Sequence, residues 1–193
     1  QNSCGWTGLG SIGSDPSNAW ILRCDNAGVY AHELGHNVSM NHASTETSEY
    51  GDTSDPMGAA ASDLKHINGP HYEQMGWRSG GQIQVASEGG TFDIAPLAQA
   101  PVDALAPQIV KVAKADSGEY YYLSYRQPIG FDANLPTSVF ERLYIHRFAG
   151  NGGRTTLLRG LLAGDSFVDE VNGITITHVA RTADYLTARI DME

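Results

Sequence analysis

Eleven residues of the chain, from His32 to His42, contain three of its seven histidines. His32 and His36 are four residues apart, so on an α-helix both imidazoles project from nearly the same face. Two imidazoles placed this way can reach one metal ion, about 2.0–2.1 Å from each nitrogen. His42 lies too far along to continue the same helical face. The stretch therefore predicts a helix, a chain reversal and a site with three histidine ligands.

Glu33 lies about 100° around the predicted helix from His32. Its carboxylate can stand beside the metal without binding it, which is where a base acting on a metal-activated water must be. Three histidines also leave one tetrahedral position open, as a catalytic zinc site requires. The competing interpretation is a set of surface or buried structural histidines. We predict Glu33 as the catalytic residue and His32, His36 and His42 as Zn²⁺ ligands.

The segment from His32 to His42, His-Glu-Leu-Gly-His-Asn-Val-Ser-Met-Asn-His, resembles the extended zinc-binding consensus of the metzincin metalloendopeptidases. The resemblance implies a methionine turn beneath the metal, and Ser54-Asp55-Pro56-Met57-Gly58 matches it. Together with the stretches YGDTSDPMG and HINGPHYEQMGW, the motif is most similar to the gametolysin-like (autolysin) branch. The specific motifs cover about Gly5 to Trp77. The resemblance implies a zinc endopeptidase that acts on proteins or glycoproteins of a cell wall or matrix.

Three features depart from the family pattern. Ser39 occupies the position of a glycine in the reversal, so the backbone there either accepts strain or avoids the left-handed conformation. Ala59 stands where some metzincins have a tyrosine. Only about 25 residues precede the predicted helix, and Gly5–Gly13 resembles the edge strand of the family's sheet. We therefore expect a possible upstream segment of the same precursor to complete that sheet.

The chain divides by pattern near residue 80. Residues 1–80 are predicted as a metzincin-like catalytic domain that lacks its upstream sheet. It contains a helix from Ala27 to about Val38, capped by Asp25 or Asn26, and a second helix over Pro70–Met75. Trp77–Gln82 is the expected linker to a β-rich domain over residues 81–193.

Residues 81–193 alternate apolar and polar side chains with a period of two, which is typical of strands. The predicted strands are QIQV, TFDIAPL, QIVKVA, YYYLSY, RLYIHRF, ITITHV and YLTARIDM. Asn172-Gly173 is a pair favoured by tight hairpins. The fold class predicted is α+β, the C-terminal part of a metzincin-like catalytic domain followed by an antiparallel β-sandwich-like domain.

Charge and cysteine content bear on the setting of the protein. The formal net charge of −10 argues against nucleic acid as a partner, and no apolar run is long enough to span a membrane. A disulfide between Cys4 and Cys24 would close a loop of about 20 residues and contribute about 3 kcal/mol. The alternative is two buried free thiols. Few lysines and paired cysteines favour a secreted protein.

The other candidate groups have weaker signals. We expect structural or solvent-facing roles for His66 and His71, and no ligand role for His146 and His178. The acidic stretch Gly164–Gly173 fits no calcium-loop spacing and is predicted as a solvated hairpin. The sequence therefore predicts a secreted zinc-dependent endopeptidase. The alternative is an extracellular binding or adhesion module whose zinc site is structural or vestigial.

Overall fold

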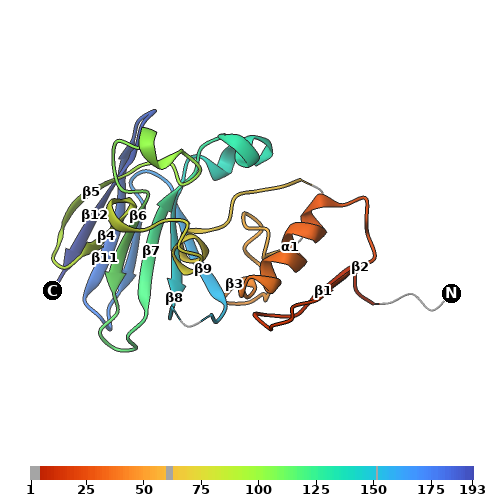
Figure 1. Cartoon of the computed structure of the whole chain (residues 1–193). Coiled ribbons are helices and arrows are strands. Elements are labelled where there is room, and N and C mark those ends of the chain that lie inside the picture. Colours follow the sequence, from red (N-terminus) through yellow and green to blue (C-terminus); the bar gives the residue numbers. More distant parts are fainter. Residues whose placement is uncertain (1–4, 60–62, 151) are drawn as a thin grey trace.

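The computed structural model describes residues 5–59, 63–150 and 152–193, which form two larger β-sheets and a smaller part with a helix and a two-stranded sheet (Figure 1). In chain order the elements are β1 (Gly8–Gly10), β2 (Ala19–Ile21), α1 (Ala27–Asn37), β3 (Ala43–Thr45), α2 (Gly69–Gln74), β4 (Ile83–Ala86), β5 (Gly90–Ile94), β6 (Ile109–Ala113), β7 (Tyr120–Tyr125), β8 (Leu143–Phe148), β9 (Thr155–Leu161), β10 (Ser166–Asp169), β11 (Ile174–Arg181) and β12 (Leu186–Met192). Both α-helices of the described chain precede residue 80. The predicted α+β class is confirmed.

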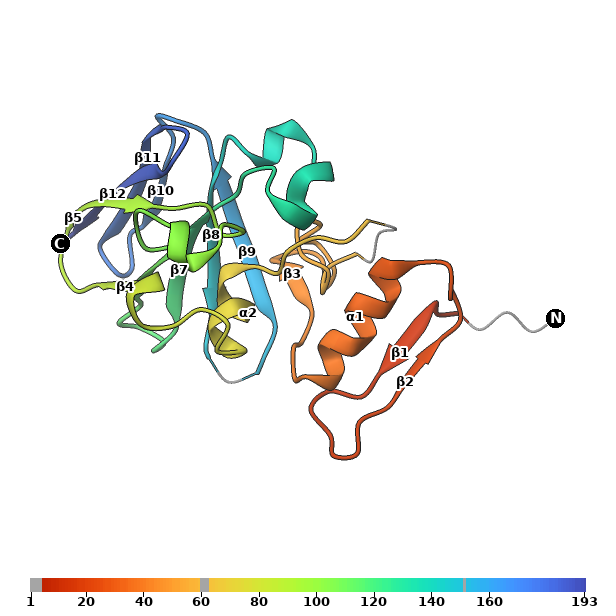
Figure 2. The same ribbon diagram turned by 45° about the horizontal axis from the view of Figure 1, so that its top comes forward.

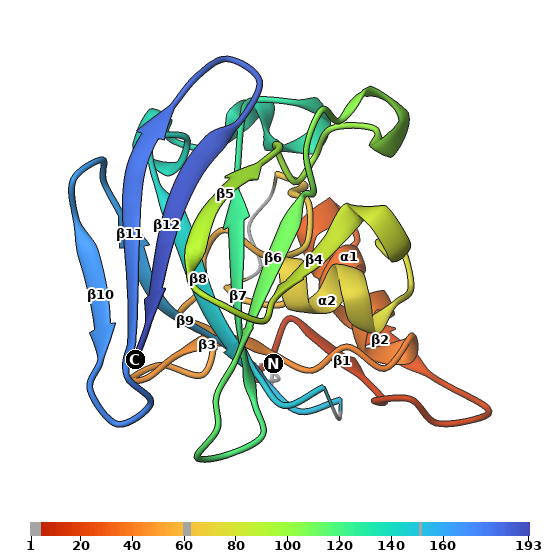
Figure 3. The same ribbon diagram turned by 90° about the vertical axis from the view of Figure 1, so that its left-hand side faces the viewer.

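The two larger sheets lie face to face, as Figure 3 shows. One has the strand order β10-β11-β12-β5 and is antiparallel throughout. The other has the order β3-β9-β8-β7-β6-β4, in which β3–β9 and β4–β6 pair in parallel. Alternate side chains of both sheets form one buried apolar cluster, which includes Ile94, Val110, Leu123, Ile145, Ile176 and Leu186. The period-two pattern therefore marks real strands, but they are not all antiparallel.

The opposite face of the six-stranded sheet packs against the helical part (Figure 2). Tyr121 points between the sheets, whereas Tyr122 points the other way and joins a second cluster. That cluster draws on both sides of residue 80: its buried members are Met40, Ala43, Met57, Ile67, Tyr72, Leu97, Ile109, Tyr122 and Phe148. The domain division stays a prediction, but the two segments share this apolar contact and a strand pairing, β3 with β9.

The expected linker Trp77–Gln82 is held in place at Arg78. The Arg78 guanidinium lies 4.4 Å from the centre of the Tyr72 ring and donates a hydrogen bond to the Leu97 carbonyl at 3.0 Å. Arg78 therefore anchors the segment to both sides of residue 80, while Trp77 and Ser79–Gly81 are exposed.

Helix α1 begins and ends close to its predicted limits. Asn26 is the N-cap, and its side chain accepts a hydrogen bond from the Val29 amide at 3.2 Å. At the other end the amides of Ser39 and Met40 donate to the carbonyls of His36 and Gly35, the pattern of a Schellman motif. Ser39 has a φ of 75°, so it does adopt the left-handed conformation that glycine would accept more readily. The reversal that returns the chain towards His42 is thus built with local strain.

The second helix, α2, also matches its prediction within one residue. Asn68 caps it by accepting a hydrogen bond from the His71 amide, and Pro70 lies in its first turn. Gly76, with a φ of 68°, follows its end.

The N-terminal strand is one half of a hairpin. β1 pairs antiparallel with β2, and the turn cluster Ser14–Asn18 connects them. Leu9 and Trp20 lie opposite each other and are exposed, whereas Gly8 and Gly10 face α1. β1 lies within the strand predicted at Gly5–Gly13, whereas β2 was not predicted.

Several other expectations are corrected or left open. Strands β3, β9 and β10 were not predicted, while the Asn172-Gly173 turn does join β10 to β11. Cys24 is free and exposed, so the alternative of two buried thiols is wrong for it, and its expected disulfide gains no support. Cys4 lies outside the described residues. No helix in the described part of the chain has the length and apolar character needed to cross a membrane.

Candidate metal centre

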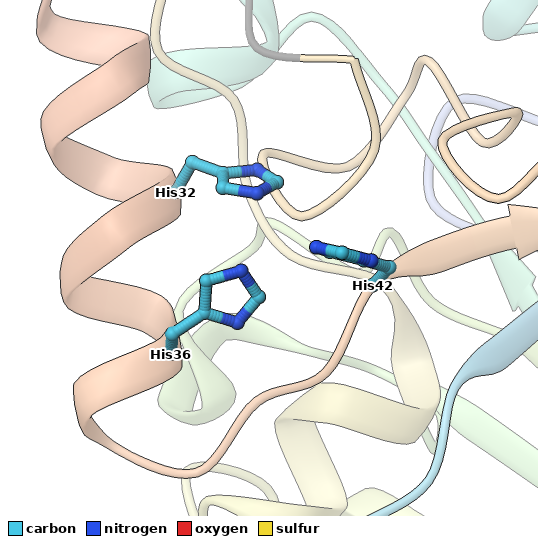
Figure 4. Close-up of side chains that lie close together, drawn as sticks. All are labelled: His32, His36 and His42. Carbon is cyan, nitrogen blue, oxygen red and sulfur yellow. The ribbon is translucent and has the colours of Figure 1, made fainter. Parts of the chain in front are cut away.

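His32, His36 and His42 point at one another (Figure 4). The first two project from α1, and the third lies between the reversal and β3. Their possible ligand nitrogens are all within 4.8 Å of one another. In the ranges the structure describes, no other group of three or more His, Cys, Asp or Glu side chains is arranged so that it could hold a metal ion. The amide of Thr155 donates to the His42 carbonyl at 3.2 Å, so strand β9 helps to hold the third histidine. The structure thus brings together the three predicted ligands.

The hydrogen bonds of the three imidazoles determine which nitrogen is free. Each Nδ1 donates to an acceptor: the Pro56 carbonyl at 2.8 Å for His32, the Met40 carbonyl at 2.9 Å for His36 and the Glu49 carboxylate at 2.7 Å for His42. Because these acceptors cannot donate, each Nδ1 carries the proton. Each Nε2 therefore offers a lone pair. Partners of this kind are what orients histidine ligands in metal sites.

Burial lowers the pKa of all three histidines. Loss of hydration is the largest cause for each, and it outweighs the opposite effect of the hydrogen-bond acceptors. A lowered pKa keeps the rings neutral at neutral pH, and only a neutral imidazole can bind a metal.

Glu33 lies beside the three histidines under strand β1. Its side chain is 6% exposed, and burial raises the pKa of its carboxyl, while the nearby His36 lowers it. A Cβ on Gly8 would lie 2.3 Å from Glu33 Oε1, and a Cβ on Gly10 would lie 2.6 Å from the Glu33 carbonyl oxygen. Only glycine at these two positions lets the strand approach the helix so closely. The same contact confines the carboxylate to the cleft.

A cleft of about 420 Å³ opens at this carboxylate. It is lined by Gly5, Trp6, Thr7, Gly8, His32, Glu33, Tyr50, Gly58 and Ala59. The Tyr50 ring lies 4.2 Å from the His42 ring, centre to centre. The backbone carbonyl of Tyr50 accepts a hydrogen bond from the Ala59 amide. Burial raises the pKa of Tyr50, helped by the charges of Glu49 and Glu33. The cleft therefore has a phenol, contributed by residue 50 rather than residue 59.

Comparison with known proteins agrees with this geometry. The family model for gametolysin peptidase M11 matches residues 1–158. The chain belongs to the gametolysin peptidase family. No curated protein and no solved structure matched it.

Membership of the gametolysin family implies a metal, and the donor set of this peptidase fits one. Three neutral imidazoles with converging lone pairs are ligands that zinc accepts, and they leave room for a fourth ligand. Met57 is fully buried. A Cβ on Gly35 would lie 2.3 Å from its sulfur, so the methionine packs directly against the helix. Met57 is thus a packing residue in the peptidase, as expected.

The remaining histidines of the peptidase lie outside the centre. His71 is buried and bonded to the Asp55 carboxylate at 3.2 Å, and His66 lies beside Tyr72. His146 donates to the Asp52 carboxylate at 2.9 Å. Burial alone would raise the pKa of Asp52, but hydrogen bonds from His146 and Ser54 and the charge of Arg126 lower it overall.

Sequence reasoning missed Glu49 and Tyr50 as members of the site. No spacing pattern distinguishes these two residues from the other residues of the Ser-, Thr- and Asp-rich loop in which they lie. The only available signal was their place between His42 and the methionine turn.

Proposed function

We propose that this chain is a secreted, zinc-dependent endopeptidase of the metzincin type that cleaves peptide bonds in extracellular proteins or glycoproteins. The observation that carries the proposal is the convergence of three Nε2 lone pairs beside a buried carboxylate. His32, His36 and His42 would hold the zinc ion. When bound, zinc supplies a Lewis acid that polarises the scissile carbonyl and makes water more acidic.

Glu33 has the position of the general base. Its carboxylate, kept in the cleft by β1, accepts a proton from the attacking water and passes it to the leaving amine. The raised pKa of the carboxyl suits a group that must both take and release a proton near neutral pH.

Strand β1 offers a binding edge for substrate. One of its edges pairs with β2, and no described strand pairs with the other. An extended peptide can bind such an edge through main-chain hydrogen bonds. Tyr50, on the other side of the cleft, is placed to contact the same peptide.

The two-part architecture belongs to this proposal. Residues 1–80 would form the metzincin-like part of the catalytic domain, completed by a possible upstream segment of the precursor. Residues 81–193 would form a sandwich-like β domain. The alternative is a binding or adhesion module with a structural or vestigial zinc site. Such a site would not need a carboxylate enclosed beside the three histidines.

Cleavage of casein or a quenched peptide by zinc-loaded protein tests the proposal. Glu33→Ala should lower turnover by a factor of about 10²–10⁴ while zinc binding remains, and a chelator should abolish turnover. Glu33→Ala with wild-type turnover would contradict the role of the base. Zinc binding by the wild type without cleavage of any peptide, even with an added upstream segment, would favour the binding module.

A further inference from the structure

The turn segment of residues 52–58, here called the support loop, contacts the metal centre at two points. Its Pro56 carbonyl accepts the hydrogen bond from His32 Nδ1 at 2.8 Å. The carbonyl of Met57 accepts the amide of Ala43 at 2.9 Å, and Ala43 directly follows the third histidine. The position of the support loop therefore sets the orientation of His32 and the backbone next to His42.

Two buried carboxylates hold the support loop from within. Asp52 accepts hydrogen bonds from the Ser54 amide at 3.1 Å and the Ser54 hydroxyl at 2.7 Å. Asp55 accepts the Met57 amide at 2.6 Å and a ring nitrogen of His71 at 3.2 Å. Both carboxylates are fully buried, so each depends on these donors to replace water.

Asp52 also connects the loop to the six-stranded sheet. Its second oxygen accepts a hydrogen bond from Nε2 of His146, on strand β8, at 2.9 Å. The two residues are separated by 94 positions in the chain, and the contact between them is a polar one. His146 is 1% exposed, and its Nδ1 has no hydrogen-bond partner in the described structure. An unpaired ring nitrogen in the interior costs stability, so an apolar side chain would serve packing alone better.

His178 provides an internal comparison. It is also a buried strand histidine, on β11, with one ring nitrogen bonded and the other without a partner among the described residues. Its Nδ1 donates to the Leu161 carbonyl at 2.9 Å. The bonded nitrogen of His178 thus reaches only the neighbouring sheet, whereas that of His146 reaches the support loop.

We propose that His146 is a positioning residue for the metal centre. Through Asp52 it fixes the support loop, whose carbonyls orient His32 and hold Ala43 next to His42. The inference rests on the proposed zinc site and adds that the β-rich part of the chain tunes the affinity of that site. It assigns a role to a strand residue that touches none of the three ligands.

The test uses the different reach of Asn and Gln. In His146→Gln the side-chain amide nitrogen can lie near the position of the histidine Nε2, whereas the shorter side chain in His146→Asn cannot reach Asp52. His146→Asn should weaken zinc binding by about tenfold or more, and His146→Gln should restore most of the affinity. Zinc affinity is measured by competition with a chelator in the full chain. The visible spectrum of the cobalt(II)-substituted protein should change in the Asn variant and resemble the wild type in the Gln variant.

His178 supplies the matched controls with the opposite geometry. Because its Nδ1 is the bonded atom, His178→Asn should retain the hydrogen bond and His178→Gln should lose it. Both should bind zinc like the wild type, even where His178→Gln lowers the midpoint of thermal unfolding. If His146→Asn does not fold, Asp52→Asn tests the same contact from the other partner.

The results separate the two proposals. Wild-type zinc affinity and cobalt spectrum in His146→Asn, or an equal loss of affinity in His178→Gln, would overturn the positioning role while leaving the proposed function intact. A wild-type protein that binds no zinc would overturn both.

Discussion

The two buried regions of this molecule are held together in different ways. Between the sheets, the buried residues are almost all aliphatic or aromatic and come from strands that alternate inside and outside. Around the three histidines, single hydrogen bonds to Pro56, Met40 and Glu49 fix each ring. Apolar packing tolerates substitutions that keep volume and pattern, whereas a hydrogen bond with one donor and one acceptor does not. The sheets should therefore control stability, and the polar frame should control the chemistry.

The largest expected effect concerns the apolar core. Leu123, on β7, is fully buried between the sheets. Leu123→Ala should lower the free energy of unfolding by about 2–5 kcal/mol because it leaves a cavity. Zinc affinity of the folded protein should not change. Chemical denaturation and zinc competition measure the two quantities, and Val85→Ala, at an exposed strand position, is the control. A loss of zinc affinity in folded Leu123→Ala would show that the two regions are not separate.

Gly8 tests the polar frame from the side of strand β1. A Cβ at residue 8 would lie 2.3 Å from Glu33 Oε1, so Gly8→Ala must displace the carboxylate or the strand. Because small misplacements of catalytic groups are costly, kcat/KM should fall by about 100-fold with little change in zinc affinity. Gly81→Ala is the control, since Gly81 is exposed, lies outside the cleft, and has no atom within 4 Å of the Cβ that the substitution would add. Equal activity of the two variants would remove the argument for a confined Glu33.

Glu49 tests the frame from the side of the third histidine. Its carboxylate accepts a hydrogen bond from His42 Nδ1, and Glu49→Ala should weaken zinc binding by about 10–100-fold. The stability of the metal-free protein should change little, because Glu49 is substantially exposed. Glu46→Ala removes a similar exposed acid, which pairs with Arg159, and should leave zinc affinity unchanged. The same competition assay compares them, and equal affinities would mean that Glu49 does not orient His42.

The smallest effect is expected at Ser39. Replacing this left-handed residue with glycine relieves strain, so Ser39→Gly should raise the free energy of unfolding by up to about 1 kcal/mol. Ser39→Ala keeps the Cβ and should give no gain. Denaturant titration of both variants provides the measurement. A gain of similar size in Ser39→Ala would point to the hydroxyl rather than to the backbone.

Local patterns predicted the local features of the fold. The spacing of His32 and His36 and the limits of both helices depend only on residues within one or two turns, and the strands rich in β-branched or aromatic residues were found. Strand β9 was missed because Arg159 and Gly160 interrupt its pattern, and β3 because its three residues, Ala43–Thr45, are too short to show one.

The support of the site could not be predicted in the same way. Asp52 and His146 are joined by the folding of distant segments, and no spacing in the chain reports that contact. The three ligands and Glu33 were found because a helix and one reversal bring them together. The positions of Glu49, Tyr50 and His146 relative to the site are set by contacts between loops and strands.

The pairing of β3 with β9 also determines when the centre can form. Ala43 lies opposite Thr155, and Thr155 holds the carbonyl of His42. During synthesis, the helix with its two histidines leaves the ribosome long before the strand that secures the third. Contacts between residues so far apart form late, since a long stretch of chain must first be ordered. We therefore expect the metal centre of a growing chain to remain incomplete, and the chain proteolytically inactive, until β9 has been made.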